Sequence, residues 1–155
     1  MTPGVNAVRK SKVPHRIHEY SHDDSSESYG LEAAEKMGVP EERVFKTLVV
    51  SLDNKELVVA VVPVSTMLSM KLIAKVSGAK KAAMASKVDA ERSTGYVLGG
   101  VSPLGQKRRL RTIIDSSAGN YPTIYVSAGR RGLEIELSPD DLAKLTSGEV
   151  AEICQ

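Results

Sequence analysis

Lys46 lies in an apolar stretch and is the first candidate for a catalytic or ligand-binding charge. In a strand that begins at Val44, alternate positions share one face, and positions 44, 46, 48, 50 and 52 read Val, Lys, Leu, Val and Leu. Burying an ammonium group costs several kcal/mol unless it is paired, so a lysine in this row indicates a functional charge. A lysine at a strand end whose amine extends into water fits the same pattern. The pattern alone leaves both interpretations open.

Segment 99–105, Gly-Gly-Val-Ser-Pro-Leu-Gly, is the second candidate. Three glycines and one proline in seven residues predict a constrained loop with exposed backbone N–H groups, which suit an anion or a carbonyl oxygen. Gly100 and Gly105 have the spacing of a nucleotide-binding P-loop, but Gln106 and Lys107 follow them, which excludes a triphosphate loop. The segment is either a phosphate-facing loop or a simple connection, and the basic residues that follow favour the first.

Basic residues cluster directly after this loop, at Lys107, Arg108, Arg109 and Arg111. The net charge of the whole chain is only +2, so no strong overall field attracts polyanions. A local cluster of this kind suits contacts with nucleic-acid phosphates, but a solvated surface explains it equally well. Aromatic residues make up only 4% of the chain, which argues against a protein that grips single strands mainly by base stacking.

The remaining reactive side chains form no recognisable catalytic or metal-binding set. In a strand, His15 and His18 point to opposite faces, which is wrong for shared metal ligation. The chain has no Gly-x-Ser-x-Gly motif, and its single cysteine is Cys154. We therefore expect no metal, no cofactor and no nucleophile supplied by the protein. An unpaired cysteine, no signal peptide and no membrane-length apolar run predict a cytoplasmic protein with no membrane partner.

Composition and periodicity predict one globular domain, residues 1–155, around these candidates, with 41% hydrophobic and 26% charged residues. Capping residues predict helices from Thr2 to Ser11, over 31–37, between Ser69 and Gly78, between Ser86 and Gly95, and after Ser138. Apolar and alternating runs predict strands over 13–20, 44–52, 57–64, 113–114, 123–127 and 133–137, with a loop at 21–28 and turns at 53–55 and 129–132. The fold class is α/β of the α+β type: a mixed, mostly antiparallel sheet or barrel with flanking helices.

Several blocks of this sequence resemble the YbaK group of aminoacyl-tRNA deacylases, which is related to the editing insertion domain of bacterial prolyl-tRNA synthetase. The similarity runs in order over nearly the whole chain. The blocks are Thr2-Pro3, 44–48 (Val-Phe-Lys-Thr-Leu), 92–96 (Arg-Ser-Thr-Gly-Tyr), 99–107, 125–129 (Tyr-Val-Ser-Ala-Gly) and 131–135 (Arg-Gly-Leu-Glu-Ile).

The resemblance implies a specific activity. Members of this family cleave the ester between a wrong amino acid and the 3′ adenosine of tRNA. The YbaK branch removes cysteine, chiefly from tRNA for proline, with Cys-tRNA(Cys) as a further candidate substrate. The thiol of the bound cysteine is thought to attack its own ester, which agrees with the lack of a protein nucleophile. The implied partners are the acceptor end of mischarged tRNA and prolyl-tRNA synthetase.

The resemblance also assigns residues. Lys46 falls on the family's essential lysine, to hold the phosphate of the terminal adenosine or polarise the ester. Gly99 and Gly100, in the Gly-x-x-x-Pro loop with Ser102 and Pro103, would supply N–H groups and substrate contacts. Tyr20, Ser127 and Glu134 fall on pocket positions. Glu134 replaces an aspartate expected in close relatives, and we expect it to keep the charge but displace it. The basic run Lys107, Arg108 and Arg109 would contact tRNA phosphates.

Three alternatives to cysteine removal remain. The chain could be a related deacylase that prefers another small amino acid, such as alanine. It could instead be a non-catalytic module that binds tRNA or prolyl-tRNA synthetase, with Lys46 and the basic run as phosphate contacts only. A structural adaptor is the third alternative, and it leaves the lysine in the apolar strand unexplained.

Overall fold

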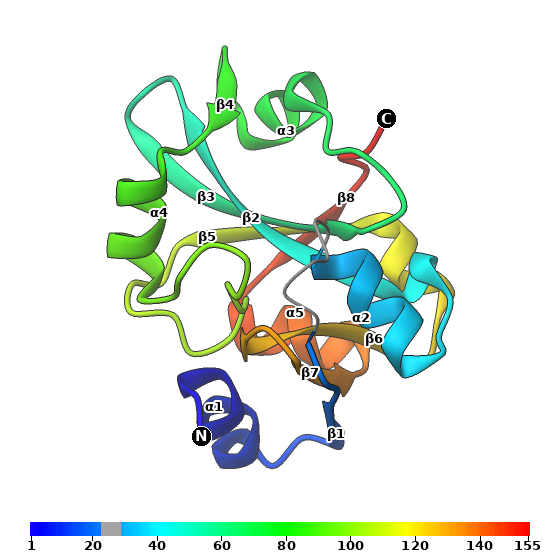
Figure 1. The fold of residues 1–155 in the computed structure, drawn as a ribbon. Helices are drawn as coiled ribbons and strands as arrows, with labels where there is room; N and C mark the ends of the chain where they lie inside the picture. The colour runs from blue at the N-terminus through cyan, green and yellow to red at the C-terminus, as the bar shows by residue number, and fades with distance from the viewer. Residues whose placement is uncertain (23–28) are drawn as a thin grey trace.

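A computed structural model describes residues 1–22 and 29–155 of the chain, so most of the predicted loop at 21–28 lies outside the described residues. The strands form one eight-stranded sheet (Figure 1). They are β1 (His15–Glu19), β2 (Val44–Leu52), β3 (Glu56–Pro63), β4 (Ala82–Met84), β5 (Arg111–Asp115), β6 (Ile124–Arg130), β7 (Leu133–Leu137) and β8 (Glu149–Ala151). The helices are α1 (Pro3–Ser11), α2 (Tyr29–Met37), α3 (Met70–Ser77), α4 (Lys87–Thr94) and α5 (Pro139–Thr146), with 3₁₀ turns at Glu41–Arg43 and Ser116–Asn120.

The strand order is β1-β7-β6-β2-β3-β5-β8, and β4 pairs with β2 outside this path. The β1–β7, β2–β3, β2–β4 and β6–β7 pairs are antiparallel, and the β2–β6, β3–β5 and β5–β8 pairs are parallel. The predicted mixed, mostly antiparallel α+β fold is therefore confirmed.

Strand β2 is central, and its two edges are paired differently. Along one edge it pairs with β3 from Phe45 to Leu52. Along the other edge it pairs with β6 only at Val44 and Phe45, and with β4 only from Val50 to Leu52. Neither the β6 ladder nor the β4 ladder includes residues 46–49 of β2. This interval is called the β2 gap below.

Both faces of the β2–β3 hairpin are buried, which explains why its strands read as nearly continuous apolar runs. Phe45, Val59 and Val61 pack on one face with residues of β6 and β7. Val50, Val58, Ala60 and Val62 pack on the other face with Ile73 of α3. A third cluster joins Val44 and Tyr125 to Ala33 and Ala34 of α2. This packing holds the strands on either side of the β2 gap in fixed positions.

The predicted helix caps are confirmed, because a hydroxyl oxygen accepts a backbone N–H at each start. Thr2 caps α1, Ser69 caps α3, Ser86 caps α4 and Ser138 caps α5, each over 3.1 Å. The hydroxyl of Thr2 also donates to the carbonyl of Ala128 in β6. That contact ties the N-terminal helix to the sheet.

Two predictions about the chain path were wrong or incomplete. Strand β6 continues to Arg130, and a bulge between Ser127 and Arg130 absorbs the extra residues, so the predicted turn at 129–132 is confined to Arg131 and Gly132. The short strands β4 and β8 were not predicted. Each has three residues and no alternating pattern, and each forms only because a longer strand offers it an edge.

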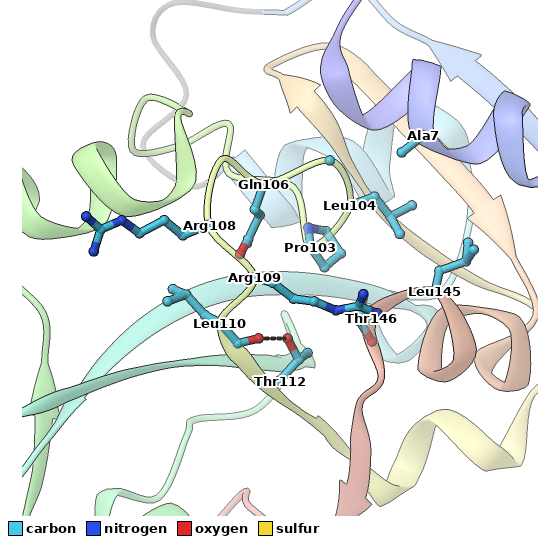
Figure 2. Close-up of a pocket in the computed structure, with 11 residues that line it drawn as sticks. Ala7, Pro103, Leu104, Gln106, Arg108, Arg109, Leu110, Thr112, Leu145 and Thr146 are labelled. Carbon is cyan, nitrogen blue, oxygen red and sulfur yellow. Dashed lines mark hydrogen bonds between the residues drawn. The ribbon is translucent and has the colours of Figure 1, made fainter.

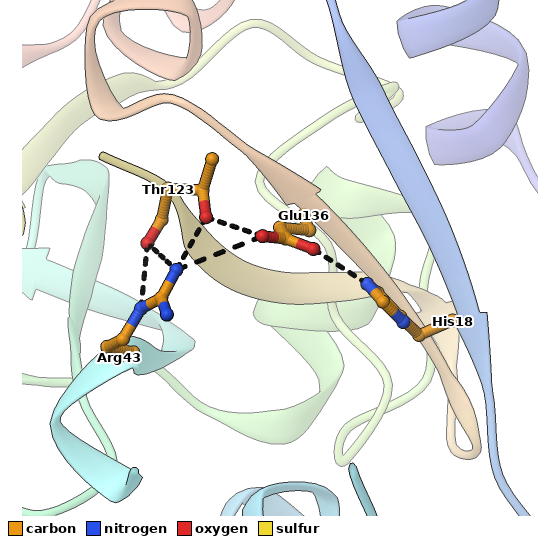
Figure 3. A network of polar contacts seen from close by, with 4 residues as sticks. All are labelled: His18, Arg43, Thr123 and Glu136. Atoms are coloured by element: carbon orange, nitrogen blue, oxygen red, sulfur yellow. Dashed lines mark hydrogen bonds and ion pairs between the residues drawn. The ribbon is translucent and has the colours of Figure 1, made fainter. Parts of the chain in front are cut away.

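A polar network joins β1, β6 and β7 to the turn before β2 (Figure 3). The Glu136 carboxylate accepts hydrogen bonds from the Thr123 hydroxyl at 2.5 Å and from the His18 ring at 2.9 Å. Arg43 donates to the Thr123 carbonyl at 2.8 Å, and its guanidinium lies over the Tyr125 ring. Burial opposes ionisation of Glu136, but the hydrogen bonds from Thr123 and His18 and the nearby charges outweigh it and lower its pKa.

We predict that Glu136→Gln destabilises the fold by about 1–2 kcal/mol at neutral pH, because a charge-assisted acceptor is lost. A lowered carboxyl pKa contributes stability that is complete above the ordinary value of 4.5 and is lost as the pH falls through the folded value. The difference in melting temperature between parent and variant should therefore shrink below about pH 4. Glu35→Gln, at an exposed position in α2, is the control. A pH-independent difference would contradict the network's charge.

Candidate functional site

A cavity of about 390 Å³ opens at the β2 gap and is called the site cavity below. Residues 44–49 of β2 form one wall, and Gly99 and Val101 of the loop after α4 face them. Tyr20, Tyr29 and Arg131 also line it. The cavity therefore forms where the sheet lacks a continuous neighbour for β2.

Strand register brings three of the predicted site residues to one face of the sheet. Ser127 of β6 lies directly opposite Glu134 of β7. Val126 pairs with Phe45, so Lys46 and Ser127 each lie one residue beyond that pair. Lys46, Ser127 and Glu134 all line the site cavity, together with the predicted Tyr20, whose backbone N–H donates to the Gly132 carbonyl at 3.0 Å. The assignment by resemblance thus places four residues from distant segments in one cavity.

Lys46 is half-buried and is the third residue of β2, so it does not lie at a strand end. None of the ion pairs among residues 1–22 and 29–155 includes it. An ammonium group without a carboxylate partner is free to neutralise a negative charge on a ligand in the cavity.

Glu134 is 6% exposed, although it alternates with the inward-facing Leu133 and Ile135. Burial raises its pKa to about 8. At neutral pH its carboxyl group is therefore mainly protonated, so the expectation that Glu134 keeps a charge is wrong under these conditions. A neutral acid donates one hydrogen bond and accepts others. Burial also raises the pKa of Tyr20, and negative charge on Glu134 adds to that effect.

The glycine loop supplies fewer free donors than predicted. Gly100 donates its N–H to the Val97 carbonyl at 2.9 Å within the loop, and it does not line the site cavity. Gly99 has φ +94°, and a Cβ there would lie 2.4 Å from the Tyr29 ring. In the described part of the chain, the N–H groups of Gly99 and Val101 have no hydrogen-bond partner. Among the described residues of this loop, Gly99 and Val101 therefore line the cavity and have N–H groups without a partner, whereas Gly100 does neither.

Ser102 and Pro103 lie away from the site cavity, so the structure does not place them as substrate contacts. The Ser102 hydroxyl accepts the Leu104 N–H at 3.2 Å, and its carbonyl accepts the Gln106 side-chain amide at 2.9 Å. Ser102 is fully buried beneath α1, with its hydroxyl close to Gly4. These contacts hold the loop in one conformation against α1 and so fix the position of Gly99.

The basic run lies beside a different hollow, of about 220 Å³, between the loop, α1 and α5 (Figure 2). This hollow and the site cavity share no lining residue. In Figure 2, Arg108 points away from the hollow, while Arg109 extends toward α5 and donates to the Ser147 hydroxyl at 2.7 Å. Lys107 is exposed and packs beside Gly95. The structure does not bring these three residues to the site cavity.

Sequence reasoning missed three residues of the site. Tyr29 lies against Gly99, and the Arg131 guanidinium is 3.8 Å from the centre of its ring. Thr47 lines the cavity, and its buried hydroxyl has no hydrogen-bond partner among the described residues. The position of Thr47 next to Lys46 was a usable signal. The contact of Tyr29 with Gly99 joins residues 70 positions apart, and no local pattern predicts it.

Other reactive groups do not enter the site cavity. Burial raises the pKa of the Cys154 thiol to about 11, and Cys154 lies outside the cavity. Across residues 1–22 and 29–155, no three His, Cys, Asp or Glu side chains gather as a metal ion would require. Within the same residues, every helix is too short or too polar to cross a membrane.

Comparisons with known proteins agree with the fold and with the family that the sequence resembles. A family model for the aminoacyl-tRNA editing domain matches residues 27–145. EbsC of Enterococcus faecalis, named as a candidate Cys-tRNA(Pro)/Cys-tRNA(Cys) deacylase, is 41% identical over 98% of this chain and 92% of its own length.

Two solved structures share the fold. The hypothetical protein APE2540 is 22% identical with a TM-score of 0.88, and the match covers 99% of both chains. A candidate trans-editing enzyme for prolyl-tRNA synthetase is 21% identical with a TM-score of 0.87, over 99% of this chain and 95% of that one. On the family match and the identity to EbsC, the chain belongs to the aminoacyl-tRNA editing domain family, in the YbaK/EbsC group.

Proposed function

We propose that this chain acts in the cytoplasm as one domain, residues 1–155, and deacylates Cys-tRNA(Pro), with Cys-tRNA(Cys) as a second substrate. The observation that carries the proposal is the site cavity, which is lined by Gly99 of the glycine loop and by Lys46, a lysine with no ion-pair partner among the described residues. Ser127 supplies a hydroxyl group, but among the described residues that line the cavity there is no histidine to act as a base for it. A substrate that brings its own nucleophile fits such a site.

The cysteine thiol of the substrate is that nucleophile. Its thiolate attacks the ester carbonyl carbon, a carbon–sulfur bond forms, and the bond to the 3′ oxygen breaks. The 3′ oxygen takes up a proton, and the cyclic thioester opens with water to free cysteine. The protein must fold the side chain toward the carbonyl and stabilise the developing oxyanion, and both effects supply several kcal/mol.

The residues of the site cavity divide these tasks. The N–H groups of Gly99 and Val101 are the candidate donors to the oxyanion, and the Lys46 ammonium supplies the positive charge, toward the ester oxygen or the phosphate of the terminal adenosine. Glu134, Ser127 and Tyr20 offer hydrogen bonds to the amino acid. Because Glu134 is mainly neutral below about pH 8, it acts there as a hydrogen-bonding group and not as a counter-ion.

The basic run serves a different part of the same substrate in this proposal. Lys107, Arg108 and Arg109 are exposed and lie outside the site cavity, so they would contact phosphates of the acceptor stem. Prolyl-tRNA synthetase would supply selectivity for the rest of the tRNA as a partner, since the chain as a whole carries a net charge of only +2.

We predict that Lys46→Ala lowers the single-turnover rate on cysteinyl-tRNA for proline by at least about 100-fold, because the cavity loses its unpaired charge. The melting temperature should hold, since the lysine is half-buried and has no ion-pair partner among the described residues. Lys55→Ala, in the exposed β2–β3 hairpin, is the matched control. Near-normal turnover by Lys46→Ala would refute the assignment.

A second prediction concerns the nucleophile. The rate on cysteinyl-tRNA should climb from about pH 6 toward the reference thiol pKa of about 8.5, and seryl-tRNA should react more than about 100-fold more slowly. Ionisation of Glu134 near pH 8 could mimic such a rise, so the profile must be repeated with Glu134→Gln. If the rate of the Glu134→Gln variant still rises with pH, the rise is due to ionisation of the substrate thiol. Equal rates on both substrates would indicate attack by water.

Glu134→Gln also tests the buried acid directly through stability. Because burial raises the folded pKa to about 8, the unfolded chain releases the Glu134 proton at lower pH than the folded one. Folded stability should then fall as the pH rises from about 4.5 to 8. The glutamine variant lacks this loss, so its melting temperature should increase relative to that of the parent across that pH interval. A constant difference would mean that Glu134 is charged in the folded protein.

Simultaneous replacement of Lys107, Arg108 and Arg109 by alanine should raise KM for charged tRNA and leave kcat largely unchanged. The reason is that binding of the ground state and of the transition state is weakened equally. The salt dependence of binding should also flatten, since each phosphate contact releases counterions. Alanine at the exposed Lys80 and Lys81 is a control of similar charge. An unchanged salt slope would make the run a solvated surface.

A further inference from the structure

A groove of about 350 Å³ adjoins the site cavity and is called the side groove below. Residues 95–100 form one side, and Gly129, Arg130 and Arg131 form the other. The groove and the site cavity share four lining residues, Tyr29, Leu98, Gly99 and Arg131. A molecule whose end lies in the site cavity can therefore reach the adjoining side groove by passing these shared residues.

Tyr29 stands at the boundary between the two spaces. Its ring lies against Gly99 on one side, and the Arg131 guanidinium is 3.8 Å from the ring centre. Arg131 is in turn held by the Glu32 carboxylate at 3.2 Å. Tyr29 is nevertheless 42% exposed, so part of this fixed aromatic and guanidinium surface is open to a flat group.

Glycine backbone makes up much of the side groove. A Cβ on Gly129 would lie 2.6 Å from the Tyr96 ring, and one on Gly100 would lie 3.1 Å from the Arg130 Cα. Tyr96 is itself held by a 2.6 Å hydrogen bond from its hydroxyl to the Leu104 carbonyl. The loop and the end of β6 therefore pack closely, and the groove between them is already formed.

The exposed side chains at the groove combine a cation with apolar surface. The Arg130 side chain is 55% exposed, and its ion pair with Glu19, at 3.9 Å, is weak because the Glu19 side chain is 75% exposed. Val97 is 71% exposed and Leu98 is also exposed. A phosphate can replace Glu19 as the partner of Arg130 with little loss of free energy. The faces of nucleobases can pack against Val97 and Leu98.

We infer that the side groove binds the unpaired nucleotides that precede the terminal adenosine of tRNA. The inference rests on the proposed function: with the ester in the site cavity, the strand would pass Tyr29 and enter the adjoining side groove. Gly95, which also lines the groove, lies beside Lys107, the first residue of the basic run. The groove thus links the ester site to the residues proposed to contact the acceptor stem.

The test compares cysteinyl esters of three lengths: adenosine alone, the trinucleotide cytidine-cytidine-adenosine, and full tRNA for proline. Arg130→Ala should raise KM about tenfold on the trinucleotide and the tRNA, at unchanged kcat, and leave the adenosine ester unaffected. Val97→Ser should show the same length dependence with about a threefold effect. Arg16→Ala, an exposed arginine on β1, and Val150→Ser, at a 56% exposed valine on β8, are the matched controls and should behave as the parent.

The outcomes separate the two proposals. In one outcome the parent protein cleaves the tRNA ester, but Arg130→Ala and Val97→Ser are unaffected or equally impaired on all three esters. That outcome overturns the inference about the side groove and leaves the proposed function standing. A parent that cleaves none of the cysteinyl esters overturns both. Circular dichroism melting of each variant identifies a folding defect, and Arg130→Lys, which keeps the charge, should restore most of the loss if a phosphate is the ligand.

Discussion

The arrangement of the site depends on the interrupted pairing of β2. Its backbone is fixed by β3 along one edge, while β6 holds only its first two residues and β4 only its last three along the other. Because both faces of the hairpin are buried, the interval between the two ladders cannot close by bending. Lys46 lies in this interval, and the register of β6 and β7 brings Ser127 and Glu134 to the same face, where all three residues line the site cavity.

The charge balance of the cavity follows from burial. Burial keeps Glu134 mainly protonated at neutral pH. The positive charge of Lys46 is available to a ligand because none of the ion pairs among the described residues includes it. The glycine loop adds the N–H groups of Gly99 and Val101, and the buried Ser102 holds that loop from behind. The site therefore presents positive charge and donors to a substrate whose reaction develops negative charge.

The parts of the structure that depend on local sequence were predicted from it. Helix caps at Thr2, Ser69, Ser86 and Ser138, and the hairpin at 53–55, are encoded within a few residues. The unusual place of Lys46 was visible from strand periodicity, but its cavity was not, because that requires knowing where β6 and β4 stop. Packing between distant segments decides the remaining features of the site. It buries the Ser102 side chain, directs the Gly100 N–H to a carbonyl of its own loop, and brings Tyr29 against Gly99.

The central claim is that the aminoacyl end of tRNA lies in the β2 gap, between Lys46 and Gly99. A crystal structure of the protein with a non-hydrolysable amide of cysteine and 3′-amino-3′-deoxyadenosine tests it most directly. We predict that the cysteinyl carbonyl lies within hydrogen-bond reach of the Gly99 or Val101 N–H, with the Lys46 amine contacting the carbonyl or the adenosine moiety. A cysteinyl group bound in the hollow beside Arg109, or in the site cavity without contact to Lys46 and the glycine loop, would contradict the account.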